Sequence, residues 1–348
     1  MQAQLINLDT GEPLEAFSAL NDQRAFGADV ISRIDAARSG KLNELFAAIN
    51  SQTENILKYF IHKWNLSDIE KCAVSGNTTM LHLFCRTDPS AMGSAPFTPV
   101  FLEERNFAGK ELSLSAGQLT LLPGISAFVG ADITAGLALT GIMNGVNALF
   151  IDIGTNGEMA VWKESEKRLF CCSTAAGPCF EEAEITCGLK AADFIDAIAA
   201  MRRQEAIDET GALADGFARA GFPVTERKII TQKDVRRFQL AKSAVYSGIR
   251  MLCKTAALGL TKIETAYIAG GIGNNLNLEN AALTGLLPRE IINNAKTCGN
   301  TSLKGAVQSL TDPSFMQLCR RVIACAETAE LAQDKYFAAA FAHNMGFA

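Results

Sequence analysis

Several features that would assign this chain to a common class are absent from its 348 residues. It has no excess of positive charge, because 32 Lys and Arg are outnumbered by 37 Asp and Glu, spread along the chain. Without a basic field, binding to nucleic acid or to an anionic membrane surface is disfavoured. The chain also lacks C-x-x-C spacing and a G-x-G-x-x-G string, which argues against a ferredoxin-type iron–sulfur cluster and a dinucleotide-binding Rossmann fold.

The ten cysteines lie mostly within apolar segments, a distribution that is not typical of a disulfide framework. The opening MQAQLINLDTGE has the pattern of a strand and a turn rather than of a signal peptide, so we expect reduced, buried thiols in a cytoplasmic protein. The longest uncharged stretch, residues 133–151, contains three glycines and two asparagines and lacks basic flanks. It therefore predicts a buried helix that leads into a buried strand, and no membrane span.

Length and composition predict two folded domains. A chain of 348 residues is longer than one core usually spans, and 48% of its residues are apolar. We expect an α/β protein with domains at 1–146 and 147–348. The expected elements are a hairpin at 5–17, helices at 22–40 and 41–64, a strand at 71–74, a hairpin-like segment at 110–124, a helix at 129–143, a strand at 148–151, a hairpin at 159–172, helices at 188–205 and 232–259, a strand at 265–268 and a final helix at 314–331.

The two halves of the chain repeat one pattern. QLINLDTGEPLEAFSAL matches MAVWKESEKRLFCCSTA as hairpin against hairpin, and KCAVSGNTT matches TAYIAGGIGNN as strand, small-residue turn and helix start. The second half opens with an additional strand that carries DIGTNGE, for which the first half has no counterpart. We therefore predict a tandem duplication of one α/β unit, with the first copy short by its first strand.

Two glycine-rich turns follow buried strands in the second half. In Asp152–Glu158, two glycines let the backbone approach a ligand, so that N–H groups and the Thr155 hydroxyl can face phosphate oxygens. Asp152, at the end of its strand, is placed to hold a hydrated Mg²⁺ or to orient a water; the alternative is a tight turn capped by an aspartate. The second turn, A-G-G-I-G-N-N at 269–275, favours the ligand-binding alternative. The pair resembles the ATP clamp of the acetate and sugar kinase, Hsp70 and actin (ASKHA) superfamily, which implies two ribonuclease-H-like domains around a nucleotide cleft.

Longer strings place the chain near one branch of that superfamily. They are LNDQRAFGADVISRI, SGNTTMLHLF, PFTPVF, LPGISAFVGADITAGL, IDIGTNGE, STAAGPCFEEAEITCG, ITQKDVRRFQLAKSAVYSGI, AGGIGNN and GNTSLKGA. Over nearly the whole chain these resemble the reductive activators of corrinoid proteins. The resemblance implies an activator that uses ATP and Mg²⁺ to return a Co(II) corrinoid on a methyltransferase partner to Co(I).

The resemblance also implies roles for particular residues. The implied phosphate loop contains Asp152, Gly154, Thr155, Asn156 and Gly157, with Asp152 as the metal ligand; the adenosine turn contains Gly270, Gly271 and Gly273. Three further sites each have a plain alternative. Lys242 approaches the nucleotide or is a solvated helical lysine, Asn77 and Thr78 reach the cleft or cap a helix, and Glu181 with Glu182 activates water or lies on the surface.

The chain also departs from that family. Such activators carry an N-terminal 2Fe-2S ferredoxin domain and a first D-x-G-T loop, neither of which this sequence contains. Electrons are therefore expected from a separate or upstream 2Fe-2S protein, no iron–sulfur cluster is expected within the chain, and its own ATPase activity stays open. The resemblance further implies a homodimer. The alternative functions are a small-molecule kinase on the same fold and a non-catalytic interaction protein.

Overall fold

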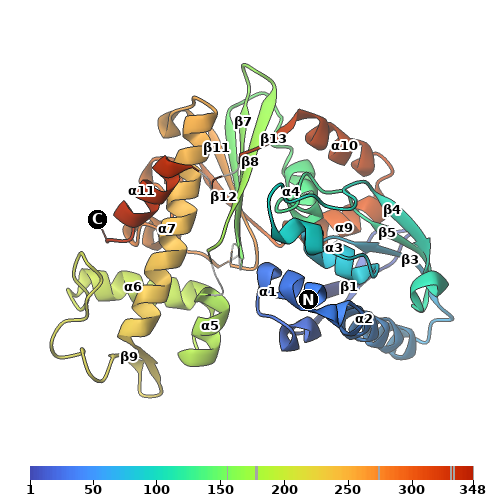
Figure 1. Ribbon diagram of the computed structural model, residues 1–348, viewed down its shortest axis with the longest axis horizontal. Coiled ribbons are helices and arrows are strands. Elements are labelled where there is room, and N and C mark those ends of the chain that lie inside the picture. The colour runs from blue at the N-terminus through green and yellow to red at the C-terminus, as the bar shows by residue number, and fades with distance from the viewer. Residues whose placement is uncertain (155, 177–178, 273–274, 330, 332–333, 348) are drawn as a thin grey trace. The chain divides into compact units, whose positions relative to one another are not determined.

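A computed structural model describes residues 1–348 except 155, 177–178, 273–274, 330, 332–333 and 348 (Figure 1). The chain forms two compact units: unit 1 contains Met1–Gly141 and Thr301–Cys325, and unit 2 contains Ile142–Asn300 and Ala326–Ala348. Residues 301–325 thus pack with the first half of the chain. Gly305 explains the close packing, because a Cβ there would lie 2.6 Å from the Cβ of Ala135.

Unit 1 combines short strands with helices of very different length. Its elements are β1 Gln2–Ile6, β2 Pro13–Ser18, a 3-10 turn Asp22–Ala25, α1 Val30–Ala36, a π-helical turn Ala37–Lys41, α2 Leu42–Trp64, β3 Ile69–Val74, α3 Thr78–Phe84, a 3-10 turn Ser90–Gly93, β4 Arg105–Ala108, a 3-10 turn Gly109–Leu112, β5 Ala116–Leu121, α4 Ala131–Thr140, α9 Thr301–Thr311 and α10 Phe315–Cys325.

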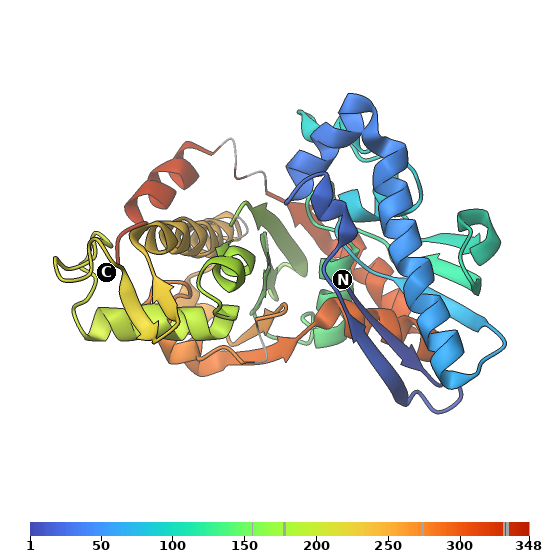
Figure 2. The same cartoon turned by 90° about the horizontal axis from the view of Figure 1, so that it is seen from below.

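The strands of unit 1 form two separate sheets. β1 and β2 pair as the predicted antiparallel hairpin, and β3, β5 and β4 form a second sheet in which β3 is parallel and β4 antiparallel to β5. β2 lies against α2 (Figure 2), where the ring of Phe17 contacts that of Tyr59 at a tilt of 56° and Glu15 pairs with Lys63. α9 contacts both β1 and β3. Gly40, the expected helix end, has φ +90° and introduces a kink rather than a break, so the chain runs on into α2.

Unit 2 is built around one larger sheet. Its elements are β6 Ala148–Ile153, β7 Gly157–Lys163, β8 Arg168–Thr174, α5 Cys179–Thr186, α6 Ala191–Arg203, β9 Phe222–Thr225, β10 Lys228–Ile230, α7 Gln232–Thr255, a 3-10 turn Leu260–Lys262, β11 Thr265–Ala269, α8 Leu278–Leu283, a 3-10 turn Arg289–Asn294, β12 Ala295–Gly299, β13 Ala326–Thr328 and α11 Lys335–His343.

The sheet of unit 2 has the order β12-β11-β6-β7-β8-β13. β6 is parallel to β11 and antiparallel to β7, and every residue of β6 except Asp152 is buried. This confirms the prediction of a strand buried on both faces, which the continuous apolar run 148–151 indicates. α7 packs on β7 and β8, and α11 lies beside α7 (Figure 1).

The end of the chain differs from the prediction. The helix expected at 314–331 is wrong in its length, because α10 ends at Cys325 and Ala326–Thr328 form β13, parallel to β8. Backbone hydrogen bonds at the sheet edge therefore outweigh helical periodicity there. The sequence patterns also give no indication of α11 or of the segment that follows it.

Two further expectations concern the cysteines and the membrane. None of the ten cysteines, all of which the structure describes, is in a disulfide bond, and Cys171, Cys172 and Cys253 are buried. Burial raises the pKa of the Cys171 and Cys253 thiols to about 12, so these thiols stay protonated and inert. Within the described ranges, none of the helices combines the length and the hydropathy that a bilayer span requires.

Candidate functional site

The two glycine-rich turns predicted from the sequence meet in unit 2. β6 and β11 are parallel neighbours, and Asp152, near the carboxyl end of β6, pairs in register with Ala269, the last residue of β11. The carboxyl ends of parallel strands are where α/β folds usually place their ligands. Asp152 is also opposite Glu158 of β7, so the 152–157 loop and the 269–271 turn share one edge of the sheet.

Gly270 is the residue that makes this approach sterically possible. Its φ is +96°, and a Cβ there would lie 2.5 Å from the carbonyl oxygen of Ile153 and 2.8 Å from Oδ1 of Asp152. No other residue type fits this backbone conformation and this spacing. The glycine thus lets the β11 turn pass directly beside the carboxylate of Asp152.

The loop itself leaves room above the same carboxylate. A Cβ on Gly154 would lie 3.9 Å from Oδ1 of Asp152, and the Gly154 amide donates to the carbonyl oxygen of Asn156. A Cβ on Gly271 would meet no atom within 4 Å. Gly157 is packed differently, because a Cβ there would lie 2.9 Å from Oγ1 of Thr174 and 3.0 Å from Cγ2 of Val245 in α7.

This arrangement fits a phosphate-bearing ligand with a magnesium ion. Mg²⁺ usually takes one or two protein carboxylates and completes its shell with water and substrate phosphates. Asp152 supplies such a carboxylate, and the glycines beside it keep side chains out of the way. Among the residues that the structure describes, no group of three or more His, Cys, Asp or Glu side chains gathers as a metal site.

Some predicted residues cannot be placed. Thr155 and Gly273 lie outside the described residues. Glu181 and Glu182 belong to α5, but their side chains are also outside the described part of the chain. Their roles stay predictions.

Lys242 is not the solvated helical lysine that the sequence left open. Its side chain is only 3% exposed, and Nζ donates to the carbonyl oxygens of Asn344, at 2.9 Å, and of Gly346. Burial lowers its pKa to about 8, and the nearby guanidinium of Arg202 acts in the same direction. The solvated alternative is therefore wrong, because the C-terminal segment covers this face of α7. A nucleotide contact by Lys242 stays a prediction.

In unit 1, Asn77 and Thr78 are both engaged at the start of α3. Oδ1 of Asn77 accepts a hydrogen bond from the Met80 amide at 2.9 Å, which makes Asn77 the N-cap. The Thr78 hydroxyl donates to the carbonyl oxygen of Ser126 at 2.6 Å. The capping alternative thus describes Asn77, whereas the Thr78 hydroxyl connects α3 to the loop at Ser126. Whether they also contact a nucleotide stays a prediction.

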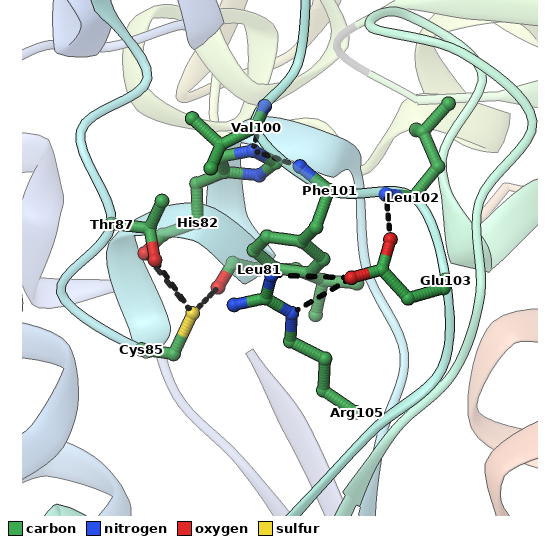
Figure 3. Close-up of polar contacts among 9 residues, drawn as sticks. All are labelled: Leu81, His82, Cys85, Thr87, Val100, Phe101, Leu102, Glu103 and Arg105. Atoms are coloured by element: carbon green, nitrogen blue, oxygen red, sulfur yellow. Dashed lines mark hydrogen bonds and ion pairs between the residues drawn. The ribbon is translucent and has the colours of Figure 1, made fainter.

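His82 ties α3 to the neighbouring chain segment (Figure 3). Nε2 accepts from the Val100 amide at 3.0 Å, so Nδ1 carries the proton and donates to the Thr78 carbonyl oxygen at 2.7 Å. The ring stacks on Phe101 at 4.2 Å, and Arg105 lies over the Phe101 ring at 4.0 Å. Burial lowers the pKa of His82, and Arg105 adds to this, so the neutral form that the hydrogen bonds require is favoured.

Residues 102–106, which follow Val100 and Phe101, line a pocket of about 650 Å³ in unit 1. The pocket is bounded by α10, by residues 102–106 and by residues 123–125, and Arg320 pairs with Glu104 at its wall. Because Thr78 holds Ser126 and His82 holds Val100, both loops that bound the pocket are attached to the first turns of α3.

Asp132 is a half-buried titratable group that stands in the sequence only as the acid beside a long uncharged stretch. It lies in the first turn of α4, next to the start of α3, since a Cβ on Gly130 would lie 2.8 Å from Oδ1 of Asp132 and 2.5 Å from Cα of Asn77. Burial raises the pKa of Asp132 to about 6. An isolated acid at the edge of an apolar run is the signal that would have identified it.

Comparison with known proteins adds the family. The family model described as the RACo middle region matches residues 1–145, and the one described as the C-terminal domain of RACo, the ASKHA domain, matches residues 146–210 and 193–348. The chain belongs to the RACo family. The mixed α/β fold of its second half is therefore the ASKHA fold that the glycine-rich turns indicate.

Relatives and a solved structure agree with this assignment. The corrinoid activation enzyme RamQ of Eubacterium limosum is 30% identical over 405 residues, which cover 99% of this chain and 68% of the relative. A reductase of the Co(II) methylated amine-specific corrinoid protein from Methanosarcina barkeri is 24% identical over 378 residues, which cover 90% and 68%. A solved structure, the reductive activator for corrinoid, iron–sulfur protein, superposes with a TM-score of 0.90 at 28% identity over 99% of this chain. This chain spans 64% of the length of that structure.

Proposed function

We propose that this RACo-family chain is the nucleotide-binding part of an ATP-dependent activator, which returns the Co(II) corrinoid of a methyltransferase system to Co(I). The observation that carries the proposal is the end-to-end match to both RACo regions. The two curated relatives are named for acting on corrinoid proteins, and the chain is similar to both over nearly its whole length.

The chemistry of the substrate explains why a nucleotide is useful. Reduction of Co(II) to Co(I) is uphill from biological donors, so electron delivery needs a second source of free energy. A nucleotide provides it when it binds one conformation of the activator better than another and so shifts which partner complex is favoured. In this chain Asp152 would orient the magnesium ion of the nucleotide, Gly154 would let phosphate oxygens reach backbone N–H groups, and Gly270 and Gly271 would support the adenosine.

The same proposal includes the partners. The corrinoid protein is the electron acceptor, and electrons come from a separate or upstream 2Fe-2S protein, because the cysteine spacing of this chain does not match a ferredoxin. We place the reaction in the cytoplasm and expect the activator to work as a homodimer. Sedimentation velocity of the purified chain measures the last point.

Two measurements test the function. The first is the thermal unfolding of the chain with and without Mg²⁺-ATP, for which we expect a rise in Tm that Asp152→Ala abolishes. The second is the visible spectrum of a Co(II) corrinoid protein mixed with the chain and a low-potential donor, in which the Co(I) bands should grow only when ATP is present. Growth that is independent of both ATP and the chain would contradict the proposal.

A further inference from the structure

The outer face of α7 carries an unusual row of buried polar side chains. Gln239, Lys242, Ser243 and Ser247 are between 0% and 3% exposed. Buried polar groups are costly unless they are paired, and each of these four has a partner among residues 341–346, while Gln239 also donates to the Thr210 carbonyl oxygen at 2.9 Å. Ser243 donates to the Phe341 carbonyl oxygen, Gln239 donates to that of Met345 at 2.8 Å, Lys242 donates to those of Asn344 and Gly346, and Ser247 accepts from Nδ2 of Asn344 at 2.9 Å.

Phe347 completes this attachment. Its side chain is 1% exposed, its ring is parallel to that of Phe238 with 6.2 Å between the centroids, and its amide donates to the Glu209 carbonyl oxygen at 2.7 Å. Two cations face the ring, with Nζ of Lys242 at 5.0 Å and Cζ of Arg202 at 5.5 Å from its centroid. The pocket around Phe347 is therefore an aromatic wall flanked by positive charge.

The segment is held in a way that allows it to leave. α11, which precedes it, has no fully buried residue: Phe337 and Phe341 are only partly buried against the core, and residues 344–347 add their own contacts to α7. Most of these contacts are hydrogen bonds to main-chain carbonyl groups, which any acceptor of similar position can replace. Departure of residues 344–347 would leave the Lys242 ammonium group without its two carbonyl acceptors, and this favours a second ligand that supplies them. Gln239 would keep the Thr210 carbonyl oxygen as an acceptor, and Ser243 that of Phe341 in α11.

The position of this pocket relates it to the 152–157 loop. Lys242 precedes Val245 by three residues, about 4.5 Å along the helix, and Val245 is the α7 residue that contacts Gly157. On its other side Lys242 faces the chain that follows α8, because its Nζ is 3.0 Å from where a Cβ on Gly285 would lie. The Phe347 pocket is thus bordered by α7, less than one helical turn from Val245, which contacts the 152–157 loop. It is also bordered by Gly285, which follows α8.

A ligand that replaces the segment must present a planar ring to Phe238, negative charge or π density to two cations, and acceptor atoms to the Lys242 ammonium group. A nucleoside phosphate has all three. We propose that residues 344–347 are an internal plug of the nucleobase pocket, in which Phe347 occupies the place of the base, so that the plug and the nucleotide exclude each other. This rests on the nucleotide-binding function proposed above and adds its regulation.

The first test removes the aromatic ring of the plug and keeps the rest of the chain. Phe347→Ala should increase amine labelling of Lys242, followed by peptide mass spectrometry, and Mg²⁺-ATP should protect Lys242 again. The apparent Kd for ATP should fall by about tenfold, because the competent state no longer has to be opened. Tyr336→Ala, on the exposed side of α11, is the matched control and should behave as the wild type in both measurements.

A second variant covers the case in which Phe347→Ala unfolds. Phe347→Trp keeps an aromatic plug, and its fluorescence should shift to longer wavelength when ATP displaces it. Equal ATP affinity in the wild type and in Phe347→Ala, or a fluorescence spectrum of Phe347→Trp that does not respond to bound ATP, would overturn the plug while leaving the proposed function intact. Absence of ATP binding by every variant would refute the function and the plug together.

Discussion

One strand pattern occurs in both units of the molecule, in two different environments. In unit 2, β6 lies between β11 and β7, and its residues are buried apart from Asp152. In unit 1, the corresponding strands β3 and β1 belong to separate sheets, and within the described residues no strand lies between them. β1 has a single buried residue and so has β3, whereas six of the seven residues of β7 are buried. A central strand with partners on both sides thus distinguishes the sheet that carries the glycine-rich loop.

The largest expected effect is on hydrogen exchange. Amides of β6 have strand partners on both sides and should exchange only on global unfolding, whereas β3 has a strand partner only in β5 among the described residues. We expect protection in β6 to exceed the average of β3 by on the order of a thousandfold. Exchange measured by mass spectrometry on short peptides checks this. Equal protection in the two strands would mean that something covers β3 as fully as its neighbours cover β6.

The turns after the matching strands β11 and β3 offer a sharper contrast. Gly270→Ala places a Cβ against the Ile153 carbonyl oxygen at positive φ, so we expect a loss of about 3 kcal/mol in the free energy of unfolding. Gly76, at the matching turn of unit 1, meets only the Cβ of Met80 at 3.9 Å, and Gly76→Ala should cost less than about 0.5 kcal/mol. Urea denaturation of both variants gives the difference. Similar costs at the two turns would show that the close approach of the turn to a neighbouring strand is not specific to unit 2.

Unit 1 depends instead on side chains that connect its pieces. His82→Ala removes the partners of the Thr78 carbonyl and the Val100 amide together with the stacking on Phe101, and should cost about 2 to 3 kcal/mol. The lowered pKa of His82 adds a pH dependence. Below pH 6.5 His82 binds a proton in the unfolded chain more readily than in the folded one, so the free energy of unfolding falls as the pH falls. His62→Ala, at an exposed position of α2, is the control and should lose neither. Acid sensitivity that survives in His82→Ala would assign the effect elsewhere.

The smallest effect concerns Asp132. Its pKa is raised from 3.8 to about 6, so between these values the folded state binds more protons than the unfolded state, and stability decreases as the pH rises. Asp132→Asn should remove this dependence and add on the order of 2 kcal/mol at pH 7. Asp68→Asn, on an exposed loop, tests the removal of a charge alone. If both variants keep the wild-type slope between pH 4 and 6, the raised pKa does not contribute.

Much of this architecture could be predicted from local patterns. The apolar run 148–151 identifies a buried strand, and the hairpins follow from alternation and turn residues. The association of residues 301–325 with unit 1 could not be predicted, because it depends on packing of Gly305 against Ala135, far apart in sequence.

The candidate site could be predicted in part, because local sequence patterns mark its two loops. The loops around Asp152 and Gly270 stand out because glycines mark them, and the parallel pairing of β6 with β11 then brings them together. The environment of Lys242 was not predictable. Helical spacing cannot show that the segment 344–347, about a hundred positions later, covers that face of α7. His82 likewise gives no sequence signal, since its partners are backbone groups.

The central claim is that the 152–157 loop and the 269–271 turn together bind a nucleotide beside Asp152. One titration tests this claim most directly. Mg²⁺-ATP is titrated calorimetrically into the wild-type chain and into the variants Gly270→Ala and Gly216→Ala. Because a Cβ at 216, away from both loops, meets open space and a Cβ at 270 meets the β6 backbone, Gly216→Ala should bind as the wild type does and Gly270→Ala should not bind. Identical binding by all three proteins, or none by the wild type, would contradict the account.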